Sequence, residues 1–289
     1  MSPSSPAPAL VTPEVLRGRP LPEPTGGKNA RGSILVIGGS TETLGAVLLA
    51  AEAAMRAGAG KLQVATVASL APFAATALPE ALVRGLPETD GGAIAPDAAD
   101  TVRDLAEAAD AVLIGPGMAD KEATQAFGER LLPHLSGPMA LDALGLSCVT
   151  ADDTCLHHLG GRVVLTPNPT EIAYALHTDE EAIEADPASA TLDLAGRARA
   201  VVGLGGATSW IATHDGELWR DESGSAGLGV SGSGDVRAGI TAGPTAWSSS
   251  TRSRRPTRTS STSCYRFSKM GSSPTHRAGL WTSRTWSLL

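Results

Sequence analysis

The residues of this chain best suited to chemistry form one short run, Gly232-Ser233-Gly234-Asp235, followed by a helix-compatible apolar segment at 236–242. Backbone N–H groups at a glycine-rich helix start lack intrahelical acceptors and lie at the positive end of the helix dipole, so they can cradle an anion. A carboxylate beside a bound phosphate can accept the proton of a hydroxyl nucleophile. The run therefore predicts a phosphoryl-transfer site with Asp235 as its base; a plain helix start with an acid in its first turn is the structural alternative.

Two more glycine-rich turns follow predicted strands. Gly38-Gly39-Ser40, with Gly45-Ala46 shortly after it, is also explained by a tight turn. Gly115-Pro116-Gly117 adds a proline that fixes the bend and a glycine that lets backbone approach a ligand. Asp142 ends another predicted strand, where its carboxylate suits a metal-bound water, a substrate hydroxyl or the cap of the next turn.

The segment 166–171, Thr-Pro-Asn-Pro-Thr-Glu, is more specific because two prolines stiffen it. Thr170 is predicted to cap a following helix, and Glu171 lies in the first turn of that helix, where negative charge is favoured. With those two residues explained structurally, Asn168 is expected to be free to point into a cleft.

The histidines carry little signal. His157 and His158, with Cys155 and the acids at 152–153, are the nearest approach to a metal site, but adjacent histidines do not easily face one ion. We predict no protein-only metal site here. The chain also contains no Gly-x-Ser-x-Gly elbow, no Walker A lysine motif and no Cys-x-x-Cys.

These residues need a scaffold, and apolar runs alternate with helical segments along the chain. Such alternation predicts an α/β fold with a mostly parallel sheet and helices on both faces, whose ligands gather at the carboxyl ends of the strands. The turn residues Gly38, Gly115, Asp142, Thr166 and Gly205 all fall at such ends. The predicted strands are 33–37, 61–67, 111–114, 139–142, 162–165, 200–204, 209–213 and 217–220, and the predicted helices are 44–57, 179–184 and 193–199.

Two helix starts have recognisable caps. Thr12 before Pro13 predicts a short helix, with the threonine as N-cap and the proline at the first position. Thr178 with Glu181 three residues later has the pattern of a capping box.

Charge is distributed unevenly. Residues 1–243 hold all 30 acidic residues against 15 Lys and Arg, whereas 244–289 hold eight bases and no acid. The acidic body argues against a nucleic-acid-binding surface. The three cysteines are not spaced like metal ligands, which favours a reducing compartment. The sequence shows neither the pattern of a signal peptide nor an apolar run long enough to span a membrane. We therefore expect a cytoplasmic protein without membrane contact.

We divide the chain into a flexible Pro/Ser-rich segment at 1–24, a catalytic domain at 25–243 and an anomalous basic tail at 244–289. Of the 46 tail residues, 20 are Ser or Thr, and the apolar ones follow no helical or strand period. Three of the chain's five Trp lie there, so beside a disordered tail we favour a reading-frame change near Gly243. Without a regular continuation, the helix after Asp235 is expected to lack a packing partner. Sequencing the gene and translating its other frames tests the frame hypothesis.

The order and spacing of these motifs resemble one family, the ADP- or ATP-dependent NAD(P)H-hydrate dehydratases, which have a ribokinase-like fold. The resemblance covers about residues 12–242. The segments that carry it are 38–40 with 45–46, 79–80, 115–117, 141–143, 166–171, 204–209 and 232–235.

This resemblance implies an activity and a set of site residues. The family removes water from the 6S hydrate of NADH or NADPH at the expense of ADP or ATP, with magnesium bridging the phosphates. By position, Asp235 is the catalytic base and contacts the hydrate, whose pocket is lined by Ala46, Gly117 and Asn168. The anion hole is Gly232, Ser233 and Gly234. The nucleotide contacts are Gly205, Gly206, Ala207, Thr208, Ser209 and Gly234. An NAD(P)H-hydrate epimerase and a second copy of the chain are the protein partners considered.

The chain departs from the family pattern at three positions. Gly205 stands where the family usually has lysine, Leu144 where aspartate is frequent, and Asn168 where histidine is common. Two other hypotheses stay open: a kinase of the same fold acting on a vitamin-like alcohol, and a non-catalytic or defective nucleotide-binding protein.

Overall fold

A computed structural model describes residues 7–18 and 27–243. The strands are β1 (Ala9–Leu10), β2 (Ser33–Ile37), β3 (Lys61–Val67), β4 (Ala81–Leu86), β5 (Ala111–Ile114), β6 (Met139–Leu141), β7 (Val163–Leu165), β8 (Val201–Leu204), β9 (Ser209–Ala212) and β10 (Leu218–Asp221). The α-helices are α1 (Pro13–Arg17), α2 (Leu44–Arg56), α3 (Ala71–Ala77), α4 (Ala98–Ala108), α5 (Lys121–Leu131), α6 (Ser147–Ala151), α7 (Pro169–Leu176), α8 (Glu180–Ala185), α9 (Pro187–Ala198) and α10 (Ser233–Ala242).

The described strands form one ten-stranded sheet in the order β1-β10-β9-β8-β7-β6-β5-β2-β3-β4. Every neighbouring pair is parallel except β8 with β9 and β9 with β10, which make an antiparallel excursion. The predicted α/β fold with a mostly parallel sheet is thus confirmed. Because the parallel strands from β4 to β8 share one direction, their following turns meet along one edge.

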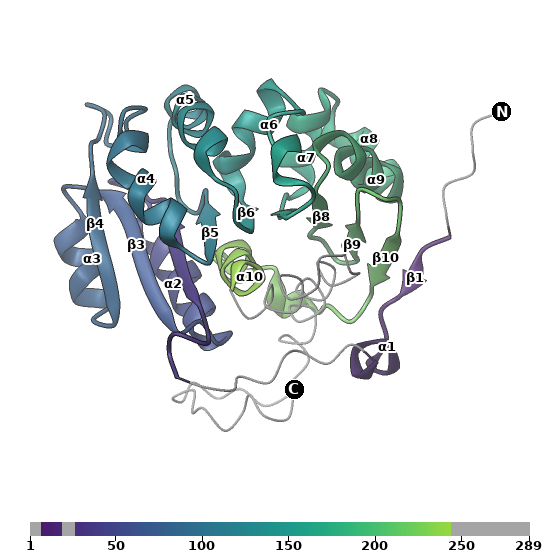
Figure 1. The fold of residues 1–289 in the computed structure, drawn as a ribbon. Helices are drawn as coiled ribbons and strands as arrows, with labels where there is room; N and C mark the ends of the chain where they lie inside the picture. Colours follow the sequence, from purple (N-terminus) through teal and green to yellow (C-terminus); the bar gives the residue numbers. More distant parts are fainter. Residues whose placement is uncertain (1–6, 19–26, 244–289) are drawn as a thin grey trace.

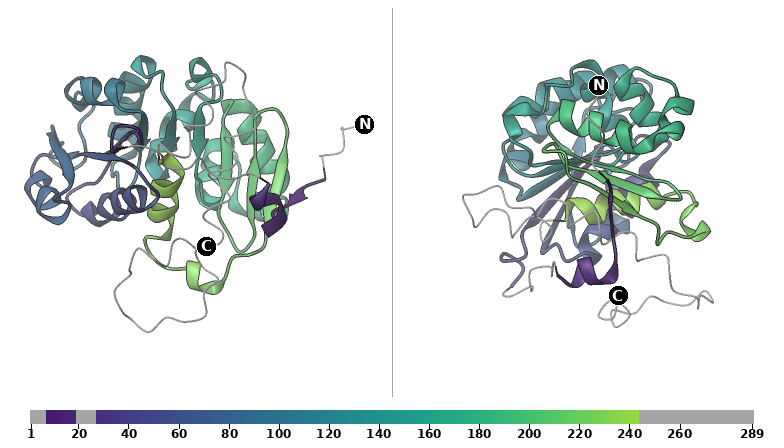
Figure 2. Two further views of the ribbon diagram at one scale, coloured as in Figure 1. Left: turned by 60° about the horizontal axis from the view of Figure 1, so that its bottom comes forward. Right: turned by 90° about the vertical axis from the view of Figure 1, so that its right-hand side faces the viewer.

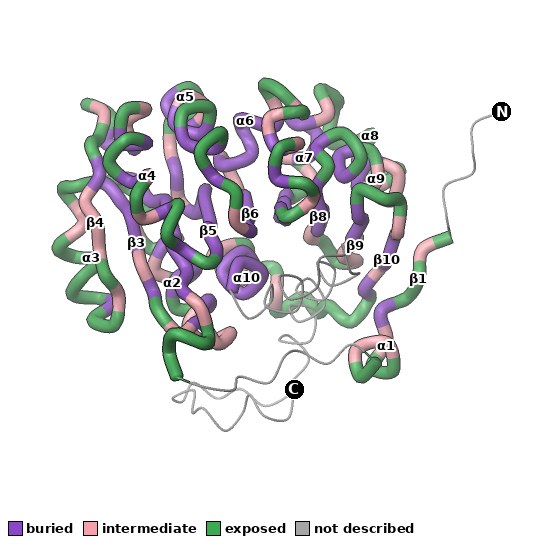
Figure 3. The backbone as a smooth tube through the Cα atoms, in the orientation of Figure 1, coloured by how far each residue is buried: buried purple, intermediate pink, exposed green. Residues whose placement is uncertain are grey.

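Both faces of the sheet are buried, as the continuous apolar run of β2 indicates. Ile34 and Val36 pack with α2 and α10, whereas Leu35 and Ile37 pack with α4, α5, α7 and α9 on the opposite face. Figure 1 shows α4–α9 above the sheet and α2 and α10 below it, and the side view in Figure 2 shows the resulting three layers. Figure 3 shows buried backbone running through the central strands, with exposure on outer helix faces, in loops and in the edge strands β1 and β4.

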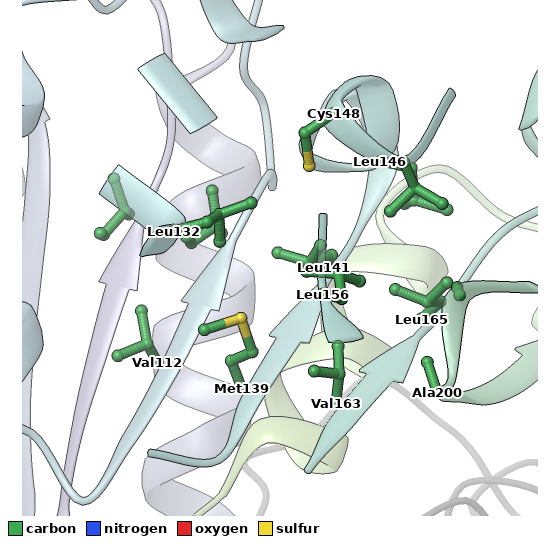
Figure 4. Packing of buried hydrophobic residues seen from close by; sticks show 14 of the residues in the cluster. Val112, Leu132, Met139, Leu141, Leu146, Cys148, Leu156, Val163, Leu165 and Ala200 are labelled. Atoms are coloured by element: carbon green, nitrogen blue, oxygen red, sulfur yellow. The ribbon is translucent and has the colours of Figure 1, made fainter. Parts of the chain in front are cut away.

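The larger hydrophobic cluster lies between the sheet and the upper helices. Figure 4 shows Met139, Leu141, Val163 and Leu165 of β6 and β7 pointing into it, with Leu156 from the connecting loop among them. This packing fixes the ends of β6 and β7, and those ends carry Asp142 and Thr166.

Helix α10 carries the predicted catalytic residue and lies in the middle of the molecule (Figure 1). It packs against α2 and also contacts β5 and β6. Ala238 and Ala242 are fully buried, and a Cβ built on Gly239 would overlap the carbonyl oxygen of Ala50. The expectation that this helix lacks a partner was therefore wrong: small residues let it approach the α2 backbone directly. Residues 244–289 lie outside the described part of the chain, so the reading-frame hypothesis stays a prediction.

The predicted caps are partly confirmed. The Thr12 hydroxyl accepts from the Val15 N–H at 3.3 Å, as expected. The capping box assigned to Thr178 was wrong, because Asp179 caps α8 by accepting from the Ala182 N–H at 2.8 Å. Its carboxylate is a stronger acceptor near the positive helix end than a hydroxyl one residue earlier.

Within the described residues, no helix is both long and apolar enough to cross a membrane.

Candidate functional site

A pocket of about 670 Å³ opens where the turns after β7 and β8 meet α10. Gly205, Gly206, Ala207 and Ser209 line it, together with Asn168, five residues between 224 and 229, and Ser233, Gly234 and Arg237 of α10. The structure therefore brings together four of the five residues predicted at 205–209 with Gly234, although they are separated by more than twenty residues in sequence. Thr208 belongs to the same loop but is not among the described residues that line the pocket.

The first turn of α10 borders this pocket. Gly232 has a positive φ of 85° as the N-cap, and its carbonyl accepts from the Val236 N–H at 3.1 Å. The Ser233 N–H already donates to the Val230 carbonyl at 3.2 Å, so an anion at this turn competes with that bond. Gly234 faces open space, since no heavy atom lies within 4 Å of a Cβ built on it. A phosphate can therefore reach the Gly234 backbone without displacing protein atoms.

Asp235 lies in the same first turn and is half-buried. Burial raises the pKa of its carboxyl, while a hydrogen bond from its own backbone N–H acts in the opposite direction. A raised pKa makes the carboxylate a stronger proton acceptor. Asp235 itself is not among the pocket-lining residues, but Gly234 and Arg237 on either side of it are.

A second, smaller hollow of about 220 Å³ adjoins the first. Leu49, Val230 and Val236 give it a largely apolar wall, and Ser233 and Leu228 line both hollows. Gly232 lines this smaller hollow and not the larger pocket, so the predicted anion-hole residues border two adjacent spaces. Ser233 lines both the larger pocket and the smaller hollow, and Asp235 follows it by two residues in the same helical turn.

Asp142 lies at the centre of the charged groups around the site. It is 5% exposed, and its Oδ1 accepts from the Thr166 hydroxyl at 2.6 Å. Burial raises the pKa of its carboxyl to about 7, and the nearby negative charges of Glu171 and Asp235 add to the effect. The Thr166 hydrogen bond and the Arg237 guanidinium oppose it. Asp142 can thus exchange a proton near neutral pH.

Glu171 behaves similarly. Burial is the main cause that raises the pKa of its carboxyl, and Arg237 again acts in the opposite direction. Two carboxylates, those of Asp142 and Glu171, therefore interact with one cation, Arg237, at the ends of β6 and β7.

Arg237 was not predicted as a site residue. Its Nη2 donates to the carbonyls of Thr166 and Pro167, which ties α10 to the turn after β7. Its Nε is buried and has no hydrogen-bond partner. Among the described residues that line the larger pocket, Arg237 alone is charged. A signal was present in the sequence, because a cation follows the acid by two residues, but only packing shows which side of the helix it occupies.

Asn168 is placed differently from the prediction. It is the N-cap of α7: its Oδ1 accepts from the Glu171 N–H and the Glu171 carboxylate accepts from the Asn168 N–H, both at 2.9 Å. Thr170 is therefore not the cap, and Asn168 is not free. Pro169 explains the difference, because proline at the first helical position requires the cap to stand immediately before it. Asn168 still lines the larger pocket.

Ala46 and Gly117, predicted on the hydrate side, lie against each other. Gly117 has a φ of 65°, and a Cβ on it would lie 2.8 Å from the Cβ of Ala46. The Thr43 hydroxyl donates to the Gly117 carbonyl at 2.6 Å and joins the turns after β2 and β5. Both residues are half-buried and border no described pocket.

The histidine pair takes part in backbone contacts. Nε2 of His157 lies 2.7 Å from the Arg197 carbonyl, and Nε2 of His158 lies 3.1 Å from that of Leu132. In the described part of the chain, no group of three or more His, Cys, Asp or Glu residues is arranged to hold a metal ion.

Comparison with known proteins gives consistent matches. A family model described as NAD(P)H-hydrate dehydratase matches residues 34–278. An ADP-dependent (S)-NAD(P)H-hydrate dehydratase from Xanthomonas campestris is 47% identical over 238 residues, which cover 81% of this chain and 78% of that protein. A bifunctional NAD(P)H-hydrate repair enzyme Nnr from Moorella thermoacetica is 36% identical, and the chain covers 42% of its length.

Among solved structures, the ADP/ATP-dependent NAD(P)H-hydrate dehydratase from Bacillus subtilis, co-crystallised with ATP and Mg²⁺, superposes with a TM-score of 0.73 at 27% identity. The superposition covers 90% of this chain and 85% of that one.

Proposed function

The chain belongs to the NAD(P)H-hydrate dehydratase family, and from this premise we propose that it removes water from the 6S hydrate of NADH or NADPH at the expense of ADP or ATP. The observation that carries the proposal is the first turn of α10. There, half-buried Asp235 stands between Gly234 and Arg237, which line a pocket large enough for a nucleotide. The identity of 47% over most of the Xanthomonas dehydratase supports the same reaction in this chain.

In the first step, Asp235 accepts the proton of the C6 hydroxyl of the hydrate. The oxygen then attacks the terminal phosphorus of the nucleotide, and the nucleotide leaves shortened by one phosphate. The raised pKa of the Asp235 carboxyl suits this role, because a base with a pKa nearer neutrality takes a proton from an alcohol more readily.

The second step is elimination. The C6–O bond breaks with its electron pair on the departing phosphate, the ring nitrogen supplies the electrons that replace them, and the neighbouring ring carbon loses a proton. The Gly234 backbone, open towards solvent at the positive end of α10, stabilises charge on the transferred phosphoryl group. We keep Gly232 and Ser233 as proposed members of this anion hole.

The nucleotide lies in the larger pocket along residues 205–209, and Thr208 is kept as a proposed contact beside the four lining residues. The hydrate reaches Asp235 from the side of the smaller hollow and of Ala46, Gly117 and Asn168.

Magnesium fits the donor set of this site as a partner of the nucleotide. The described residues offer carboxylates but no protein cage, and magnesium is commonly held by phosphate oxygens with one or two carboxylates and water. When bound, the ion neutralises negative charge on the phosphate oxygens.

Partners and location stay proposals. We propose an NAD(P)H-hydrate epimerase on a separate chain as the source of the S form, since the Moorella relative is named a bifunctional repair enzyme. Cys148 and Cys155 are free thiols in the described structure, and a cytoplasmic location and self-association remain predictions.

The test is restoration of the reduced-nicotinamide absorbance when purified protein is mixed with NADH hydrate, ADP and Mg²⁺. Asp235→Ala should abolish this recovery yet bind ADP as the wild type does. A wild-type chain that recovers no NADH, although it binds ADP, contradicts the proposal. A stable phosphorylated alcohol as product would indicate the kinase alternative instead.

A further inference from the structure

Arg237 and Gly205 occupy one space. A Cβ built on Gly205 would overlap Nη1 of Arg237 and lie 2.9 Å from its Cζ, and the third nearest atom is also from this guanidinium. The three atoms nearest to a Cβ at position 205 thus all belong to the Arg237 side chain, which stands in the way of a larger residue there. The guanidinium covers the backbone of the loop that is predicted to contact the nucleotide.

The donors of this guanidinium are unevenly used. Nη2 is occupied by the Thr166 and Pro167 carbonyls, which holds the group in place. Nη1 donates to no described residue, although it lies over Gly205 at the pocket wall. An arginine fork with one end anchored and the other end without an acceptor among the described residues is arranged to receive a further acceptor, and planar guanidinium groups bind phosphate oxygens strongly.

The charge of the pocket supports the same conclusion. No other described residue lining it is charged, whereas a nucleoside diphosphate brings several negative charges. The nearby acids Asp142, Glu171 and Asp235 would repel those charges without a cation between them.

We propose that Arg237 is the phosphate-binding cation of this nucleotide site and that Gly205 is required as glycine to admit it. This inference rests on the proposed use of a nucleotide. It implies that the two positions are coupled: a long cationic side chain at 205 has room and a function only when Arg237 is removed.

The experiment measures dissociation constants for ADP, AMP and adenosine by calorimetry, with Mg²⁺ present, for the full chain. Arg237→Met should weaken ADP binding about 10- to 100-fold, the factor for loss of a charged hydrogen bond, and change adenosine binding less than about threefold. Gly205→Ala should reproduce part of this loss by displacing the guanidinium. In Gly205→Ala/Arg237→Met the alanine should add nothing further. Gly205→Lys/Arg237→Met should regain most of the ADP affinity.

The melting temperature of each unliganded variant, with Arg237→Lys as the conservative control, reports the role of Arg237 in holding the 166–167 turn. Equal losses of ADP and adenosine affinity, or an unchanged preference for ADP over adenosine in Arg237→Met, overturn the inference. So does independent, additive behaviour of the 205 and 237 substitutions, or a wild type that does not bind ADP. Hydrate turnover is read separately: a wild type that binds ADP through Arg237 but leaves NADH hydrate unchanged refutes the proposed reaction and not this assignment.

Discussion

Two regions at the carboxyl edge of the sheet are both rich in glycine but for different reasons. In the turns after β2 and β5, here termed the packed turns (38–40 and 115–117), a Cβ on Gly38 would overlap the Pro116 carbonyl oxygen and one on Gly115 would overlap that of Asp142. In the second region, termed the open loops (205–206, 224–229 and the first turn of α10), a Cβ meets a movable side chain, ordinary contact or nothing, except at Gly206, where it would lie 3.3 Å from the Thr208 carbonyl oxygen.

The difference shows what each glycine does. Glycine in the packed turns lets backbone lie against backbone, so it holds the sheet edge together. Glycine in the open loops leaves space beside N–H groups, and that space is available to a ligand. Four substitutions, ordered from the largest expected effect on the free energy of unfolding to the smallest, distinguish packed from open glycines and the residues beside them.

Gly115→Ala should have the largest effect. The residue has a φ of 127°, and its Cβ would collide with a carbonyl that belongs to the neighbouring strand end. We expect a loss of about 4–6 kcal/mol in the free energy of unfolding, from strain and overpacking together. Chemical denaturation measures it. Gly160→Ala is the matched control, because φ is also positive (58°) but no atom lies within 4 Å, so it should cost only about 1 kcal/mol. Equal costs for both would remove the distinction between packed and open glycines.

Asp142→Asn tests a buried residue that lies directly against the packed turn at Gly115. The pKa of this carboxyl is about 7 in the folded protein, above its unfolded value of about 4. The folded state therefore binds more protons between these values, and the free energy of unfolding falls as pH rises through this window. Asparagine does not titrate and still accepts from Thr166. The variant should gain on the order of 3–4 kcal/mol relative to wild type on going from pH 4 to pH 8. Parallel stability–pH curves would show that the carboxyl is not buried as described.

Asn168→Ala should cost about 1–2 kcal/mol, because both bonds of the α7 capping box are lost. Asn168→Asp separates the cap from the pocket. Aspartate caps a helix as well as asparagine does, so thermal stability should stay near that of wild type, whereas ADP binding should weaken because a negative charge now lines the pocket. If Asn168→Asp bound ADP normally, Asn168 would belong to the packed region alone.

Gly234→Ala should have the smallest effect on stability and a clear effect on binding. Its Cβ meets nothing, and alanine favours a helix, so the free energy of unfolding should rise by about 0.5 kcal/mol. ADP affinity should fall, since the methyl group occupies space in the open loops. Gly196→Ala in α9 is the control, because it is equally unobstructed but remote from the pocket; it should show the same gain with unchanged affinity. A loss of stability in Gly234→Ala would place this glycine among the packed ones.

Much of the scaffold was predictable because buried parallel strands are continuous apolar runs. The strands at 33–37, 61–67 and 111–114 were predicted with the bounds found. β4 was missed, because Arg84 and Gly85 interrupt its pattern and the strand lies at the sheet edge. The helices α4 and α5 were missed too, because charged residues occupy most of their outer faces.

The site was predictable as a set of turns but not as a set of contacts. The sheet topology brings Gly205, Gly234 and Asn168 to one edge of the sheet. The order of the motifs along the chain was enough to predict that these residues belong to the site. By contrast, the cap of α7 depends on which residue precedes the first helical turn, and the position of Arg237 depends on packing across the turn after β7. The first relation is local in sequence, and Pro169 was the available signal that Asn168 and not Thr170 caps the helix. The second joins residues about 70 positions apart, so Arg237 was overlooked.

Helix α10 packs against α2, β5 and β6, all of which precede it in the chain. During translation the pocket-lining residues at 168 and 205–234 therefore leave the ribosome before Asp235 does. The nascent chain can begin to collapse around its apolar strands. It lacks the proposed base, Asp235, and so cannot use the nucleotide until helix α10 has been synthesised. Synthesis order thus delays reactivity until the enclosure is nearly complete.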